Sequence, residues 1–229
     1  MTAVVDYAAL ANPQRGNFPR TVVGLLLNYR QTLEALGDAV NHPPYKAPPK
    51  APVLYIKPAN TYARDGDAIT VPDDISEVVI GACLAVEFAR SATRVREEDA
   101  LDYVAGYRVV ADLYASHDVF YRPPVKHKCR DAFCPIGALQ PAARVHNPDD
   151  LAIRVLVDDQ ERQTATTRDL VRSARRAIAD ITEFMTLSAG DLLLLGIPEG
   201  APRARPGQHY RIEIDQVGSL SNKLVRSQA

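Results

Sequence analysis

The stretch "SEVVIGACLAVEFA", from Ser76 to Ala89, is apolar almost throughout. Its polar residues do not recur every three or four positions, so it does not have the pattern of an amphipathic helix. A nearly continuous apolar run is typical of a strand buried on both faces. A second such strand is predicted for "GYRVVADLYA" (106–115), after a helix that begins in "REEDALDYV" (96–104). These two strands predict a β-rich fold.

The rest of the chain adds mainly strands. The longest helical pattern is "TTRDLVRSARRAIADITEFMTL" (166–187), whose apolar residues recur at three and four and which is followed by Gly190. "LAIRVLVDDQERQ" (151–163) predicts a hairpin that turns at Asp158-Asp159. Further strands are predicted in the segments 21–30, 52–58, 191–200 and 205–218. The class is therefore α+β with few helices. We expect an N-terminal extension over residues 1–20 and a single domain over 21–229.

Composition narrows the setting of the protein. The chain has 229 residues, is 46% hydrophobic and carries a net charge of -1, so it has no global field that would attract nucleic acid or a membrane surface. No apolar run approaches the roughly 20 residues of a membrane span, and the N-terminus does not have the pattern of a signal peptide. Three cysteines are an odd number in a chain too long to need disulfides. We expect a reduced, cytoplasmic protein.

The loop "YRPPVKHKCRDAFCPIG" (121–137) concentrates cysteines and basic residues. A structural zinc ion would need matching cysteines or histidines elsewhere, and no histidine partner for a catalytic cysteine is recognisable. Both cysteines are therefore interpreted as packing residues. The basic residues around Lys128 are interrupted by Cys129 and followed by Phe133 and Pro135. This favours partial burial of a lysine, and a buried lysine needs an anion. The alternative is a basic loop that is merely solvated.

Four blocks in order, "DALDYVAGYRVVADL", "KCRDAFCPIG", "FMTLSAGDLLLLGIPEG" and "RPGQHYRIEID", resemble signature blocks of the fumarylacetoacetate hydrolase family. The segments 42–58 and 120–135 are similar to the N-terminal half, or separately encoded subunit, of the family's isomerase/decarboxylase of 4-hydroxyphenylacetate breakdown. The resemblance implies a β-rich mixed-sheet roll, often dimeric. It also implies Mg²⁺ or Mn²⁺, hard ions that prefer oxygen ligands, acting on a small 2-oxo-dicarboxylate.

The family's metal ligands carry over unevenly. Its Glu-x-Glu pair falls on Gly81 and Cys83, so both carboxylates are missing, and only the aspartate is retained, as Asp112. We therefore expect no tight metal binding. Glu77 and Glu87 share the parity of the lost ligands but lie too far along the strand to replace them. His117 is left open as a substitute.

The remaining site residues carried over by resemblance are of two kinds. The catalytic positions fall on Lys128, which is expected in the pocket near Asp112 or Asp131, and on Asp131, which is expected to hold that lysine. The positions for substrate binding fall on Asn28, Tyr29, Gly196 and Pro198.

Three functions remain open. The chain can be a degenerate subunit, in a homodimer or with an intact homologous chain, of an isomerase/decarboxylase. The reactions would be of the 5-carboxymethyl-2-hydroxymuconate isomerase and 5-oxopent-3-ene-1,2,5-tricarboxylate decarboxylase type. It can instead be a self-sufficient Mg²⁺-dependent enzyme, or a metal-free binding protein on this fold. If Asp112 and Lys128 still hold their geometry, Gly81→Glu with Cys83→Glu is expected to restore Mg²⁺ affinity, because three carboxylates would again converge on one point.

Overall fold

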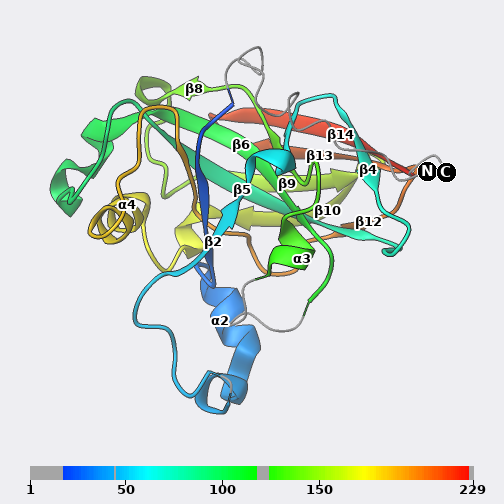
Figure 1. The fold of residues 1–229 in the computed structure, drawn as a ribbon, viewed down its shortest axis with the longest axis horizontal. Helices are drawn as coiled ribbons and strands as arrows, with labels where there is room; N and C mark the ends of the chain where they lie inside the picture. Colours follow the sequence, from blue (N-terminus) through cyan, green and yellow to red (C-terminus); the bar gives the residue numbers. More distant parts are fainter. Residues whose placement is uncertain (1–17, 44, 118–123, 227–229) are drawn as a thin grey trace.

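The structure is a computed structural model that describes residues 18–43, 45–117 and 124–226. The expected N-terminal extension (1–20) therefore lies almost entirely outside the described residues, as do positions 121–123 of the basic loop. Mixed sheets dominate and helices are few (Figure 1). The predicted β-rich α+β class is confirmed.

The strands are β1 (Val22–Leu26), β2 (Val53–Lys57), β3 (Tyr62–Arg64), β4 (Ala68–Val71), β5 (Val78–Phe88), β6 (Val104–Tyr114), β7 (Cys134–Ile136), β8 (Gln140–Pro141), β9 (Ala152–Val157), β10 (Gln160–Thr166), β11 (Leu192–Leu194), β12 (Arg203–Ala204), β13 (His209–Ile214) and β14 (Gly218–Arg226). The α-helices are α2 (Arg30–Leu36), α3 (Val125–Lys128) and α4 (Ala174–Thr182). Short 3₁₀ helices lie at Gly37–Asn41, Ala59–Thr61, Glu97–Tyr103, Ala142–Arg144 and Thr167–Asp169.

Two sheets share the core. The larger has nine strands in the order β2-β1-β11-β5-β6-β7-β3, with β12 added to β5 and β8 to β6, and the smaller runs β10-β9-β13-β14-β4. One face of β5 packs with the inner residues of the smaller sheet into the main hydrophobic core. Helix α2 extends away from the sheets, whereas α3 lies beside the C-terminal end of β6 (Figure 1).

The register of β5 and β6 positions the site. The two strands are antiparallel, with Gly81 opposite Asp112 and Cys83 opposite Val110. Because side chains alternate along a strand, Gly81, Cys83 and Asp112 share the face turned away from the main core, where Cys83 and Val110 belong to a second apolar cluster. The positions that the resemblance groups together do therefore meet on one face.

Two helix predictions differ from the structure. Helix α4 begins only after Ser173, whose hydroxyl accepts the amide of Arg176 as an N-cap, and it ends at Thr182. The prediction that it starts at Thr166 is wrong, because β10 continues through that residue and pairs it with Ala152. The helix predicted at 96–104 is a 3₁₀ helix. The hairpin at Asp158-Asp159 is confirmed, with both turn residues at positive φ.

Among the described residues, none of the helices has both the length and the apolar character needed to span a bilayer.

Candidate functional site

The centre of the site is a buried carboxylate held by two lysines. Asp112, near the end of β6, is fully buried. Its Oδ1 lies 2.7 Å from Lys57 Nζ, and its Oδ2 lies 2.6 Å from Lys128 Nζ. The hydroxyl of Tyr55 donates a hydrogen bond to Oδ2. Lys57 ends β2 and Lys128 ends α3, so two separate elements converge on this side chain of β6.

Tyr55 reaches the carboxylate because of a glycine on the neighbouring strand. Gly24 of β1 lies opposite Tyr55 in the antiparallel β1–β2 pair. A Cβ at position 24 would come within 2.1 Å of the Tyr55 ring. Only glycine leaves space for this ring, which lies across β1 with its hydroxyl on Asp112.

The ammonium group of Lys57 uses all its protons in hydrogen bonds to the backbone. Its ammonium donates to the backbone carbonyls of Leu113, Lys128 and Phe133 at 2.9, 2.7 and 2.8 Å. An ammonium has three protons, so these carbonyls use all of them. Asp112 Oδ1 is therefore held by charge alone, and it has no hydrogen-bond donor among the described residues. Lys57 thereby joins β2 to the end of β6 and to the α3 loop.

Among the described residues, Lys128 donates fewer hydrogen bonds than Lys57. Its ammonium donates to Asp112 and lies 4.6 Å from the ring centre of Tyr55 and 4.2 Å from that of Tyr114. Such distances are typical of cation–π contacts. The residue is 1% exposed and lines a cavity. The expectation that Lys128 lies buried in a pocket near Asp112 is confirmed.

The charges are coupled. Burial would raise the pKa of Asp112, but the ammonium groups of Lys128 and Lys57 lower it to about 2. The pKa of Lys128 is also lowered, first by burial and then by the like charge of Lys57, despite the opposing effect of Asp112. One carboxylate shared by two lysines cannot fully compensate both.

These residues do not fit a divalent metal ion. Gly81 offers no ligand atom, and burial raises the pKa of the Cys83 thiol, which disfavours the thiolate form that would bind a metal. The single carboxylate is already engaged by two cations. In the part of the chain that the structure describes, no group of three histidine, cysteine or acidic side chains could hold a metal ion. Glu87 does not substitute, since it pairs with Arg108.

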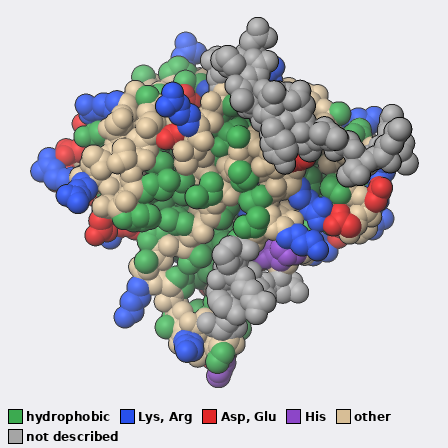
Figure 2. Space-filling view, viewed as in Figure 1, with side chains coloured by type: hydrophobic (Ala, Val, Ile, Leu, Met, Phe, Trp, Pro, Cys, Tyr) green, Lys and Arg blue, Asp and Glu red, His purple; other side chains and the backbone are tan. Residues whose placement is uncertain are grey.

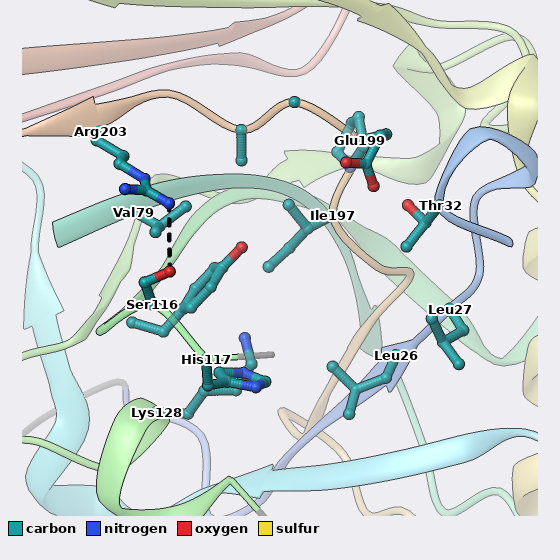
Figure 3. A pocket seen from close by; sticks show the side chains of 14 residues that line it. Leu26, Leu27, Thr32, Val79, Ser116, His117, Lys128, Ile197, Glu199 and Arg203 are labelled. Atoms are coloured by element: carbon teal, nitrogen blue, oxygen red, sulfur yellow. Dashed lines mark hydrogen bonds between the residues drawn. The ribbon is translucent and has the colours of Figure 1, made fainter. Parts of the chain in front are cut away.

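A cavity of about 290 Å³ lies beside Lys128 (Figure 3). Apolar side chains of Leu26, Leu27 and Ile197 form part of its wall. Arg203 donates to the Ser116 hydroxyl at 3.3 Å on one side, and Thr32 and Glu199 line the other. His117 also lines the cavity.

The structure brings only some of the predicted site residues together. Asp112, Lys128 and the cavity-lining Pro198 belong to one site. The expected pairing of Asp131 with Lys128 is wrong, because Lys128 pairs with Asp112. Asp131 instead accepts a hydrogen bond from Asn60 Nδ2 at 2.7 Å, in an exposed position.

Asn28 and Tyr29 lie buried behind the cavity wall. The Asn28 amide donates to the carbonyl of Leu195 at 2.8 Å, and its oxygen accepts the amide of Arg172 at 2.9 Å. Tyr29 is 1% exposed and packs in the main core. Gly196, at φ 112°, lies against the Asn28 side chain. These residues fix the wall, and their role in substrate binding stays a prediction.

Sequence reasoning missed Lys57, Tyr55 and Arg203. A signal for the first two was available in "PVLYIKP", because Tyr55 and Lys57 are two apart and share one face of a buried strand. A lysine on such a face needs an anion. Arg203 had no comparable signal, because it reaches Ser116 only through the pairing of β12 with β5.

Comparison with known sequences identifies the family of the chain. The family profile described as fumarylacetoacetate (FAA) hydrolase C-terminal matches residues 21–225. The 4-hydroxyphenylacetate degradation bifunctional isomerase/decarboxylase of Salmonella dublin is 40% identical over 205 residues, which are 90% of this chain and 47% of that protein. The mitochondrial oxaloacetate tautomerase FAHD2 of Oryza sativa subsp. japonica is 34% identical, covering 84% of this chain and 85% of its own. The chain thus spans about half the length of the bifunctional relatives.

Solved structures give the same result. The 5-carboxymethyl-2-hydroxymuconate delta-isomerase of Mycobacterium smegmatis matches with a TM-score of 0.79 and 26% identity, over 93% of this chain and 81% of that one. Maleylpyruvate hydrolase of Sphingobium sp. SYK-6, solved with manganese(II) and pyruvate, matches with a TM-score of 0.76 and 29% identity, over 93% and 72%. The chain belongs to the fumarylacetoacetate hydrolase C-terminal family.

Proposed function

We propose that this chain is a metal-free subunit of an isomerase/decarboxylase of the 4-hydroxyphenylacetate type, acting with a homologous chain that keeps its carboxylates. One observation carries the proposal: Asp112 holds two lysine ammonium groups, at 2.7 and 2.6 Å, where the resemblance expects a metal ion. Gly81 and Cys83 supply no carboxylate to compete with them. Metal-dependent chemistry on a small 2-oxo-dicarboxylate would belong to the partner.

The length of the relatives supports a partner. The bifunctional enzymes of Salmonella dublin and Escherichia coli are matched over only 47% of their length. Their names describe two activities in one chain, about twice as long as the match. A chain that corresponds to one half would reproduce such an assembly by pairing with a second chain or with another copy of itself.

An apolar surface suits that association. Figure 2 shows hydrophobic side chains gathered at the middle of the visible face, over β1 and β2. Ile56 of β2 is 55% exposed, and β2 is an edge strand paired only with β1 in the described sheet. Exposed apolar surface at a sheet edge is typical of an interaction site.

A second candidate is a metal-free binding protein or catalyst. The cavity of about 290 Å³ beside Lys128 favours it, since a subunit with a purely structural role would need no cavity there. The self-sufficient Mg²⁺-dependent enzyme is the least supported function, because the donor set is one engaged carboxylate.

Co-expression tests the proposal. The chain is purified alone and with a homologous chain that carries an intact Glu-x-Glu, and molar mass is measured by light scattering. Isomerisation of 5-carboxymethyl-2-hydroxymuconate is followed by absorbance. We expect a complex, higher activity of the complex than of the partner alone, and none from the chain alone.

A matched pair of surface variants sharpens the test. Ile56→Asp should weaken the complex, whereas Phe184→Asp, at another exposed apolar residue, should leave it intact. A strictly monomeric chain that forms no complex on co-expression would overturn the subunit proposal.

A further inference from the structure

The buried cluster carries excess positive charge. Lys57 and Lys128 contribute two ammonium groups and Asp112 contributes one carboxylate, which leaves a net charge of +1. Tyr55 adds a hydrogen bond but no charge. Burying an uncompensated charge is costly, so buried cations are normally paired with anions. The cluster is therefore one anion short.

The geometry identifies which lysine is available. Lys57 gives its three protons to three carbonyls and is not among the residues that line the cavity. Lys128 donates to one carboxylate oxygen, packs against two ring faces, and does line the cavity. An anion in the cavity would thus meet Lys128. Lys57 and Asp112 do not line the cavity and lie on the far side of Lys128 from it.

The other basic side chain considered at the cavity, Arg203, is exposed to solvent. Its side chain is 55% exposed, and its Nη1 lies 2.7 Å from Glu77, which Arg205 also approaches at 3.8 Å. An incoming anion would gain less there than at the buried Lys128, because water screens the charge of an exposed arginine.

The side of the cavity opposite Lys128 determines which second group a ligand can carry. The Thr32 hydroxyl is buried and has no hydrogen-bond partner among the described residues. Glu199 lines the same side, well separated from Lys128 in Figure 3. A neutral oxygen that bonds to Thr32 fits there, whereas a second carboxylate would be repelled by Glu199. Leu26, Leu27 and Ile197 provide an apolar wall for a short hydrocarbon chain.

We propose that the cavity binds a small monocarboxylic acid without a metal ion, with the carboxylate on the Lys128 ammonium and a neutral oxygen toward Thr32. The volume of about 290 Å³ lies just below the usual range of small-molecule sites, roughly 300–1000 Å³, which suits a small ligand. The cluster then holds two cations and two anions. The inference rests on the proposed function only in treating this site as metal-free.

Pyruvate is the probe, and the neutral pyruvamide is its matched control. Each is titrated into the ¹⁵N-labelled chain in EDTA, and again with Mn²⁺, while amide shifts are followed by NMR. We expect pyruvate to shift the amides of Ser116 and Ile197, with the same affinity in both buffers, and pyruvamide to bind at least tenfold more weakly. A hydrogen bond to a charged group is worth roughly 1.5–3 kcal/mol, so Lys128→Met should weaken pyruvate about 10- to 100-fold.

Lys126→Met controls for the loss of a lysine, because Lys126 is exposed on the same helix and does not line the cavity. It should bind pyruvate as the wild type does. The proposal is overturned if pyruvate does not bind, if binding requires Mn²⁺, or if pyruvamide binds equally well. The last comparison needs only the wild-type chain. Subunit association is not measured here, so the subunit proposal can fail or stand independently.

Discussion

Lys57→Met should destabilise the protein far more than Lys128→Met, although both lysines contact the same carboxylate. Removing Lys57 deprives three buried carbonyls of their charged donor. It also removes one of the two cations on Asp112. Breaking a buried ion pair from one side costs about 3–5 kcal/mol. We expect a loss of about 4 kcal/mol in the free energy of unfolding, most of it from groups left unpaired.

Lys128→Met should change the stability much less, because its losses and gains nearly cancel. Asp112 keeps Lys57 at 2.7 Å and the hydroxyl of Tyr55, so the carboxylate is not left alone. The variant loses one charged hydrogen bond and two ring contacts, but it also removes the uncompensated charge. Methionine retains an unbranched apolar chain that can pack between the rings. We expect a change within about 1 kcal/mol.

Urea unfolding at neutral pH, followed by circular dichroism, measures both changes. Lys126→Met, an exposed neighbour of Lys128, is the control and should match the wild type. Equal m-values would show that the compared states expose similar surface. A loss of about 3 kcal/mol or more in Lys128→Met, or a cost in that variant that equals the cost of Lys57→Met, would refute the division of roles between the two lysines. The first result requires only that Lys128→Met folds.

The frame around the cluster allows three further tests. Asn28→Ala removes the side-chain partner of three backbone groups, namely the Arg172 amide and the carbonyls of Arg172 and Leu195. It should cost about 2–4 kcal/mol in urea unfolding, and a change under about 0.5 kcal/mol would contradict its role. Gly81→Ala would place a Cβ 2.5 Å from Ile197 Cδ1 and should lower the free energy of unfolding by about 1–3 kcal/mol. Ile197→Val, which removes Cδ1, should recover part of this loss. A Gly81→Ala variant as stable as the wild type would contradict the packing. The pKa of the Asp112 carboxyl is lowered to about 2 from 3.8, so as pH falls this carboxyl is protonated first in the unfolded state. About 2 kcal/mol of stability should therefore be lost as pH falls from about 4 to about 2. A ¹³C titration that finds the Asp112 carboxyl protonating near pH 4 in the folded protein would contradict this.

Much of the site's framework could be predicted from sequence. The apolar runs in β5 and β6 indicate two buried strands, and strand alternation then puts Gly81 and Cys83 on one face. The block that contains Asp112 and the block that contains Lys128 were expected to meet, and they do. The first prediction succeeded because it depends on local pattern, whereas the meeting of the two blocks was implied by the family resemblance.

The identity of the partners could not be predicted in the same way. Lys57 is fixed by carbonyls of Leu113, Lys128 and Phe133, and backbone acceptors leave no trace in residue types. Asp131 is close to Lys128 in sequence, but α3 ends at Lys128, and the chain beyond it places Asp131 at Asn60 instead. The start of α4 was misplaced because Thr166 continues a strand pairing that its helical periodicity does not reveal.

The structure also changes what would restore a metal site. Gly81→Glu with Cys83→Glu was expected to restore Mg²⁺ affinity if Asp112 and Lys128 held their geometry, but that expectation did not foresee that two ammonium groups engage Asp112. A side chain at position 81 would also meet the Asp112 carbonyl at 2.6 Å. The two added carboxylates should therefore fail to bind Mn²⁺ while both lysines remain.

The central claim is that internal lysines take the place of a metal ion in this chain. Mn²⁺ titrated into the purified chain and followed by electron paramagnetic resonance tests it most directly, because only free Mn²⁺ gives the sharp six-line spectrum. The account predicts that the spectrum grows in proportion to added Mn²⁺ from the first addition, as in buffer alone. Loss of the signal up to one equivalent per chain, reversed by Asp112→Asn, would contradict it.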